Sequence, residues 1–475
     1  MPRPVVFVPG LPASELFHQG PGGRERIFLK LPPDVPRLLG PGDLDAGDGV
    51  EAGDPLPKVK IGFLDLAKFA NSLYDELAGL GVRHLEKVGW DWRRPVWDEH
   101  PGQVQERIGQ AIDRAFAAGG PVVLICHSTG GLGARWFLEH AAPAVRPKIA
   151  AVAAFGVPWV GTLDSFEPLI GEKGFPFTSK EDVQRMIGHS WAAFDLLPPD
   201  PATTVDAVYT RARLVVGPAL DPSGDPAVSS PLTERAWIDR LAPTASIRAA
   251  MDARRVEAGN RLGTRSPTLG GIGADLPVAT FAGWGADTLR QAILGPNGEV
   301  ALSARIDGED PGMDDGDGTI PRASAAWLRG ANVRRFHVPI GHYPDAGNLP
   351  HARLWNNPGA VAALGALVDD RPLPPQAEAA MDWSDFVETS NDVVTVRCQA
   401  SDGDGEVPAG ARIRLRLGPQ VKPWDDVDPA FGGRYMVRVE REAVPTFGNR
   451  FRRLEVEIDL ADGEPPKRVA LLCRR

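Results

Sequence analysis

The chain has little cysteine, no long apolar run and no excess of basic residues, and each absence excludes a class of protein. Its 475 residues include only three cysteines, which lie far apart. We therefore expect no disulfide framework, and no Cys/His cluster has the spacing of a zinc site. No apolar run is long enough to span a bilayer. The formal net charge of −10 disfavours a nucleic-acid binder, which would be basic. The residues call for neither a metal nor a cofactor.

The N-terminus passes directly into an apolar strand at residues 5–8. This leaves no room for the apolar segment of a signal peptide, so a cytoplasmic location is expected. Apolar residues make up 43% of the chain, which is enough for a sizeable core. A chain of this length accommodates either two or three domains or one large domain with an appendage.

Up to about residue 370, apolar runs typical of buried strands alternate with segments of helical periodicity. This pattern predicts an α/β fold with a mainly parallel sheet. Residues 11–57 are rich in glycine and proline and are expected to form a long loop. Residues 164–274 are less regular and are predicted to form an inserted cap or lid. The strands are expected at 5–8, 122–125, 149–155, 278–282 and 333–338, and the helices at 63–80, 104–118 and 358–367.

The pattern changes after the proline-rich run at 371–375, which reads as a linker. Beyond it, short segments alternate polar and apolar residues, and this predicts a small antiparallel, β-sandwich-like domain at 376–475. The tail contains no histidine, so we expect it to contribute no catalytic residue. The catalytic domain is accordingly placed at 1–370. Arg412, Arg414 and Arg416 make one strand face basic; this face is either solvated or docks a partner protein or a phosphate-bearing surface.

A buried strand is joined to an amphipathic helix by the tight turn at 126–130. This is the layout of a nucleophile elbow, in which a strained turn exposes a serine. Gly130 and Gly131 keep the helix side small, whereas Cys126 stands where a glycine is usual. Ser128 could instead merely cap the helix, but a cap does not need two glycines after it. We predict that Ser128 is the nucleophile.

A serine nucleophile needs a base that is oriented by a carboxylate, and in this fold the acid follows the serine and precedes the histidine. Asp317 is the preferred acid because it lies in the tight glycine-rich loop at 316–321. Asp287 and Asp315 rank behind it. A solvated acidic turn is the alternative, and the spacing of a full calcium loop is absent.

Three histidines near the last predicted strand are candidates for the base. His342 lies just past the strand and is preferred. His337 lies inside the strand, where packing is its expected role. His351 lies close to the last helix and is the reserve candidate.

Eight short motifs occur in order along residues 4–368, at 6–16, 61–63, 90–93, 126–130, 155–161, 190–191, 196–198 and 316–321. Together they resemble the lecithin:cholesterol acyltransferase family of α/β-hydrolases. The resemblance implies an α/β-hydrolase fold and a catalytic triad of Ser128, Asp317 and His342. It does not extend to the β-rich tail, and Cys126 departs from the family pattern.

Two backbone N–H groups must stabilise the oxyanion, and Thr129 supplies one because it follows the nucleophile. The resemblance favours Phe63 for the second, while Leu11 is its rival because it follows the first strand. Trp159 and Trp191, together with Leu11, are the expected substrate-binding residues. Ordinary core packing is the alternative for each tryptophan.

These residues together predict a serine esterase or lipase that hydrolyses or transfers acyl groups of lipid esters. A lipid or another acyl ester is the expected partner, with transient contact to a membrane surface. The alternatives are an intracellular esterase acting on a non-lipid ester and a non-catalytic scaffold on an inherited hydrolase fold. The insertion at 164–274 is expected to cover the active site and to be the first region that proteolysis or hydrogen exchange finds to open.

Overall fold

The architecture is that of a computed structural model. It describes residues 2–12, 14–20, 23–28, 50–55, 59–61, 64–67, 71–165, 167, 190–198, 215–218, 245–262, 266–284, 286, 288–289, 291–294, 300–303, 316–339, 350–374, 376–381, 393–401, 409–427, 434–447, 451–461 and 465–474.

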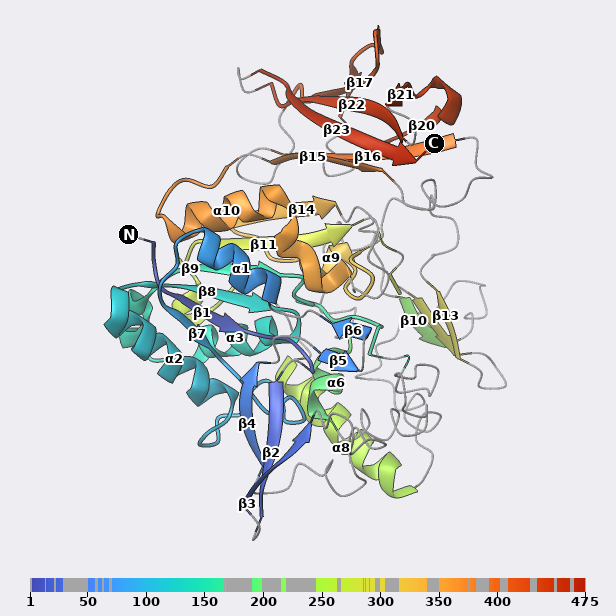
Figure 1. Cartoon of the computed structure of the whole chain (residues 1–475). Coiled ribbons are helices and arrows are strands. Elements are labelled where there is room, and N and C mark those ends of the chain that lie inside the picture. The colour runs from blue at the N-terminus through green and yellow to red at the C-terminus, as the bar shows by residue number, and fades with distance from the viewer. Residues whose placement is uncertain are drawn as a thin grey trace.

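A six-stranded sheet with the order β14-β11-β9-β8-β1-β7 forms the centre of the molecule (Figure 1). All neighbouring strands in it are parallel. The predicted parallel α/β core is therefore confirmed, and the carboxyl ends of all six strands lie along one edge. The strands are β1 (Val5–Val8), β7 (Leu85–Lys87), β8 (Val122–His127), β9 (Ile149–Phe155), β11 (Val278–Trp284) and β14 (Val333–Pro339).

Helices cover both faces of this sheet, which explains why consecutive residues of its inner strands, such as Val5–Val8 and Ile149–Phe155, are apolar. Val5 and Phe7 of β1 pack with α1 (Asn71–Gly79) and α10 (Pro358–Val368) on one face. Val6 and Val8 pack on the other face, with α2 (Val104–Gly119) and α3 (Thr129–His140). The start of α10 is set by its own sequence. The Asn357 side chain caps the helix, because its Oδ1 accepts hydrogen bonds from the backbone N–H groups of Gly359 and Ala360.

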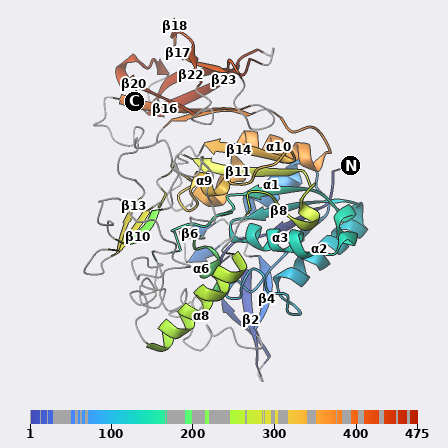
Figure 2. The same ribbon diagram turned by 180° about the vertical axis from the view of Figure 1, so that it is seen from behind.

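The predicted insertion at 164–274 falls between β9 and β11 in the chain. Its α6 (Trp191–Asp195) contacts the long α8 (Ala245–Leu262), and the two lie together in Figure 2. Its β10 (Val215–Pro218) forms a small sheet with β12 (Gln291–Leu294) and β13 (Val300–Ser303), which follow β11. The insertion therefore forms a sheet with the segment that contains β12 and β13, which lies after β11 in the chain.

Part of the loop predicted at 11–57 is instead an antiparallel sheet. Its strands are β2 (Ser14–Gly20), β3 (Gly23–Phe28) and β4 (Val50–Pro55), with β2 in the middle. A hairpin of β5 (Val59–Ile61) and β6 (Leu64–Ala67) follows. The helix expected from residue 63 begins only at Asn71. Leu16 anchors the sheet to the core, where its side chain is fully buried.

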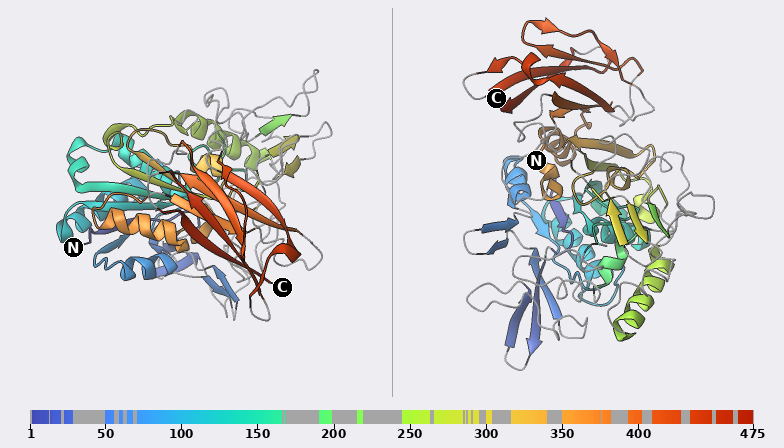
Figure 3. Two further views of the ribbon diagram at one scale, coloured as in Figure 1. Left: turned by 90° about the horizontal axis from the view of Figure 1, so that it is seen from above. Right: turned by 90° about the vertical axis from the view of Figure 1, so that its right-hand side faces the viewer.

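The tail folds into two antiparallel sheets, which confirms the expected β architecture. One sheet has the order β15-β16-β20, and the other is built around β17 and β22. The tail lies at the opposite end of the molecule from the β2–β3–β4 sheet (Figure 3). Its elements are β15 (Gln376–Met381), β16 (Val393–Ser401), β17 (Arg412–Leu417), β18 (Gln420–Val421), β19 (Asp425–Asp426), β20 (Arg434–Glu440), η7 (Arg441–Ala443), β21 (Thr446–Phe447), β22 (Phe451–Asp459) and β23 (Lys467–Arg474).

The basic face predicted on β17 is paired with carboxylates of the neighbouring strand. Arg412 binds Asp459 at 2.5 Å, while Arg414 and Arg416 bind Glu457 at 2.5 and 3.2 Å. Burial alone would raise the pKa of Glu457, but the hydrogen bond and charge of Arg414, helped by Arg416 and Arg468, lower it. This pairing accounts for the arginines within the sheet itself.

Candidate active site

Ser128 sits at the sharp turn between β8 and α3. Its backbone has φ 52° and ψ −134°, a combination that non-glycine residues rarely adopt. The turn is crowded, because a Cβ on Gly130 would lie 2.4 Å from the Pro9 carbonyl oxygen. A strained serine between a parallel strand and a helix is the geometry expected of a nucleophile elbow.

Cys126 precedes Ser128 by two residues, at the end of β8, and is fully buried in the core. Burial raises the pKa of its thiol to about 12. The thiol therefore stays protonated near neutral pH, and Cys126 acts as a small core residue at the position where a glycine was expected.

Asp317 lies after β13 and before β14 in the chain, and its side chain is completely buried. Its Oδ1 accepts hydrogen bonds from the backbone N–H groups of Thr319 at 3.1 Å and Ile320 at 2.7 Å. The loop is held in place by Thr288, whose Oγ1 accepts a hydrogen bond from the Gly318 N–H at 2.9 Å. Asp317 is thus a fixed carboxylate with one oxygen still directed toward a partner.

That partner is His351, the reserve histidine of the sequence analysis. His351 Nδ1 donates to Asp317 Oδ2 at 2.6 Å, and the histidine is nearly buried. His351 lies in the 3-10 turn η5 (Pro350–Asn356), between β14 and α10. Its Nε2 is buried without a hydrogen-bond partner among the described atoms. A histidine anchored through Nδ1 with a free Nε2 is arranged as a general base.

Several predicted candidates lie outside the described residues, namely His342, Phe63, Asp287 and Asp315. His337 lies within β14, as expected, and is buried beside Arg322, whose Nη1 is 3.2 Å from His337 Nδ1. Among the described histidines, His351 is the one that binds Asp317.

The loop after β1 lies directly against Ser128. A Cβ on Gly10 would be 2.6 Å from the Ser128 Cβ and 3.1 Å from its Oγ. Leu11, the next residue, is therefore adjacent to the elbow from the β1 side. Thr129 is the first residue of α3, where a helix has no internal acceptor for its N–H.

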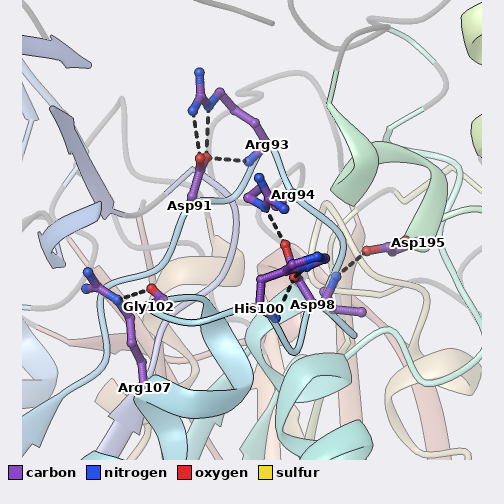
Figure 4. Close-up of polar contacts among 9 residues, drawn as sticks. Asp91, Arg93, Arg94, Asp98, His100, Gly102, Arg107 and Asp195 are labelled. Carbon is purple, nitrogen blue, oxygen red and sulfur yellow. Dashed lines mark hydrogen bonds and ion pairs between the residues drawn. The ribbon is translucent and has the colours of Figure 1, made fainter. Parts of the chain in front are cut away.

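Residues 90–103, in the segment between β7 and α2, form an anchor loop that binds α6 (Figure 4). A buried ion pair stiffens it, with Arg93 Nη2 2.6 Å from Asp91 Oδ2. Asp195 at the end of α6 accepts a hydrogen bond from the Val96 N–H at 2.8 Å. The Trp191 N–H at the start of α6 donates to the Arg93 carbonyl at 2.8 Å. This part of the insertion is therefore fastened to the sheet domain at both ends.

The other end of the anchor loop is stabilised around Asp98, whose carboxylate binds Arg94 and His100 (Figure 4). Burial alone would raise the pKa of Asp98, but the hydrogen bonds from Arg94 and His100 lower it below its usual value. Asp98 thus remains ionised and fixes the turn that leads into α2.

The two tryptophans predicted to bind substrate lie in different settings. Trp159 follows β9 and is only 1% exposed, within the hydrophobic core. Trp191 is partly exposed, and its ring lies edge-on to Trp97 at 6.0 Å between centroids. Leu11 is also partly exposed and packs against the same core. A substrate-binding role for these three residues stays a prediction.

Gly156 has a positive φ of +54°, and its backbone lies against His351 and Asp317, so a side chain at this position would disturb both residues. A Cβ there would be 2.8 Å from His351 Cε1 and 2.9 Å from Asp317 Oδ2. We expect Gly156→Ala to displace the imidazole and to lower the kcat of ester turnover by about 100-fold, as expected for a shift of about 1 Å.

Gly102→Ala is the matched control for backbone strain. Gly102 also has a positive φ, of +77°, but a Cβ there would meet no atom within 4 Å. Both variants should lose some stability in thermal unfolding, and only Gly156→Ala should lose kcat. Equal kcat in the two variants would show that the space beside His351 is not needed for turnover.

The parallel sheet, the strained elbow after its central strand and the helices on both faces define an α/β-hydrolase. Among the described residues, no helix is long and apolar enough to cross a membrane, and no group of three or more potential metal ligands occurs.

Within that class, the chain resembles the lecithin:cholesterol acyltransferase family. The model of the family described as lecithin:cholesterol acyltransferase matches residues 44–226. The lysosomal phospholipase A and acyltransferase of Homo sapiens is 27% identical over 173 residues, which cover 32% of this chain and 40% of that protein. The protein of the same name from Rattus norvegicus is 29% identical over 150 residues, covering 27% of this chain and 35% of its own length. The chain thus spans well under half of these relatives.

A solved structure shares the fold over a longer stretch. The crystal structure of the Tle4–Tli4 complex contains a chain that matches with a TM-score of 0.50 and 14% identity. The match covers 77% of this chain and 97% of the other. At this identity the likeness concerns the fold alone.

Proposed function

We propose that this protein is a serine hydrolase that cleaves or transfers the acyl group of lipid esters, with Ser128, His351 and Asp317 as its catalytic triad. The observation that carries the proposal is the buried His351–Asp317 hydrogen bond of 2.6 Å, at the same sheet edge as the strained Ser128. His351 replaces His342 in this assignment because Asp317 already binds His351.

In the proposed reaction, His351 Nε2 takes the proton of Ser128 as the serine oxygen bonds to the ester carbonyl carbon. The resulting imidazolium is stabilised by the Asp317 carboxylate and then gives its proton to the departing alcohol. Water or an acceptor alcohol next attacks the acyl-enzyme, with His351 again accepting the proton. The acyl group leaves as a fatty acid or a new ester, and Ser128 recovers its proton.

The oxyanion would be stabilised by the backbone N–H groups of Thr129 and Leu11. Thr129 offers its N–H at the first position of α3. Leu11 is favoured over Phe63 by the close approach of its neighbour Gly10 to Ser128. Two backbone N–H donors held in fixed positions stabilise the negative charge that develops on the carbonyl oxygen in the transition state.

Residues 1–370 would form the catalytic domain and 376–475 an accessory domain without catalytic residues. The insertion at 164–274 would cover the site from its anchored segment, α6. Lipid acyl esters are favoured as substrates because the family and both named relatives act in acyl transfer or phospholipid cleavage by name.

The test is fatty-acid release from phosphatidylcholine vesicles, run beside a chain-length series of nitrophenyl esters and with an added acceptor alcohol. We expect turnover of both substrate types, abolished in Ser128→Ala. Turnover of nitrophenyl esters alone would indicate a non-lipid esterase, and a folded protein inactive on both would support a non-catalytic scaffold.

A further inference from the structure

His127 is the residue immediately before the nucleophile, and the reaction described above gives it no task. Its side chain is nearly buried at the end of β8. His127 Nε2 lies 3.0 Å from the backbone carbonyl oxygen of His351. Because a carbonyl can only accept, this nitrogen must carry the proton and donate.

The ring of His127 also contacts the segment that carries His351. The two imidazole rings lie 4.5 Å apart between centroids, with an interplanar angle of 35°. The His127 ring also lies edge-on to the Trp355 indole, with 5.0 Å between the ring centroids. Trp355 is itself fixed, since its Nε1 donates to Ser72 Oγ at 2.8 Å. His127 is therefore held between two residues of η5.

We propose that His127 is a positioning residue that sets the distance between the nucleophile and the base, an inference that rests on the proposed function. Ser128 and His127 are consecutive, so one rigid stretch of backbone carries the nucleophile and the group that holds the His351 main chain. Asp317 fixes the imidazole of His351 from its Nδ1 side. His127 fixes the backbone to which that imidazole is attached.

His127 is suited to this task because it stays neutral. Burial, and next the nearby His351, lower the pKa of His127 well below its usual value. Among the described residues, Asp317 binds the His351 ring and the uncharged Trp355 packs against the His127 ring. A neutral donor beside His351 adds no positive charge when His351 takes up the serine proton. A cationic neighbour would oppose that step.

The experiment compares His127→Gln, His127→Asn and His127→Phe in the full-length protein. Glutamine places an N–H donor at about the depth of Nε2, whereas the shorter asparagine does not reach it. Phenylalanine keeps an aromatic ring at this place but has no donor. We expect His127→Gln to recover most of the kcat on a short nitrophenyl ester, and His127→Asn and His127→Phe to lose about 10- to 100-fold with little change in KM.

Thermal unfolding and the rate of labelling by a fluorophosphonate are measured for each variant. The proposal expects the labelling rate to fall with kcat, even in variants whose unfolding midpoint matches that of the wild type. Full kcat in His127→Phe, or equal losses in the glutamine and phenylalanine variants, would overturn it. So would losses that follow the unfolding midpoint alone, because that result indicates a merely structural role.

Ser128→Ala and His351→Asn are included in the same assay to separate two failures. If either retains full turnover, the proposed triad is wrong. If both are inactive while His127→Phe equals the wild type, the triad stands and only the positioning role is rejected.

Discussion

Ser128→Ala should lower ester turnover by at least about 10⁴-fold, the loss expected when a triad nucleophile is removed. The free energy of unfolding should change by no more than about 1 kcal/mol. Alanine keeps the Cβ and therefore adopts the positive φ of 52° at about the same cost. Turnover is measured on a short nitrophenyl ester, which does not depend on lipid packing, and stability by chemical denaturation.

Residual turnover of the alanine variant tests the assignment sharply. A loss with unchanged stability cannot come from unfolding, so it identifies the hydroxyl as the working group. Turnover within about tenfold of the wild type would mean that another nucleophile is used, because the oxyanion donors alone cannot supply the missing step.

His351→Asn should also lower kcat by at least about 10⁴-fold, while His342→Asn should stay within about threefold of the wild type. Asparagine can still donate to Asp317 from a position close to that of Nδ1, so the buried carboxylate keeps its partner. What the variant loses is the base at Nε2, which is unpaired among the described atoms. The pair of variants is compared by kcat and by unfolding midpoint.

The opposite ranking would contradict the assignment. If His342→Asn were inactive and His351→Asn active, the 2.6 Å contact with Asp317 would be structural and His342 would be the base. The double variant should be no worse than His351→Asn, because residues that act as one unit give non-additive losses.

The sequence was sufficient for the sheet and the elbow. Apolar runs such as 149–155 can only be buried on both faces, and the observed β9 (Ile149–Phe155) has those bounds. The turn at 126–130 placed Ser128 because few turns combine a buried strand, small neighbours and a helix. Burial of a strand and crowding of a turn each depend on neighbouring residues in the chain, so the local sequence pattern is enough to predict both.

The histidine that binds Asp317 could not be chosen from sequence. His342 and His351 both follow β14 and precede α10, and no spacing rule separates them. What distinguishes His351 is its bond to Asp317, a residue 34 positions away, and that is a tertiary fact. Proximity to the strand end favoured His342, whereas the structure joins the acid loop to the turn before the helix.

The β2–β3–β4 sheet was missed for a different reason. Residues 11–57 are rich in glycine and proline, and the strands within this segment carry several charged side chains. Arg24 and Arg26 of β3 lie over the Phe17 ring of β2, at 3.7 and 5.6 Å from its centroid. Cation–π pairs across strands leave little hydrophobic alternation in the sequence.

Mapping the residue that a fluorophosphonate labels in the full-length protein tests the catalytic assignment. We expect a single adduct on Ser128, formed much more slowly in His351→Asn and absent from Ser128→Ala. An adduct on any other residue, or labelling of Ser128 at an unchanged rate without His351, would contradict it.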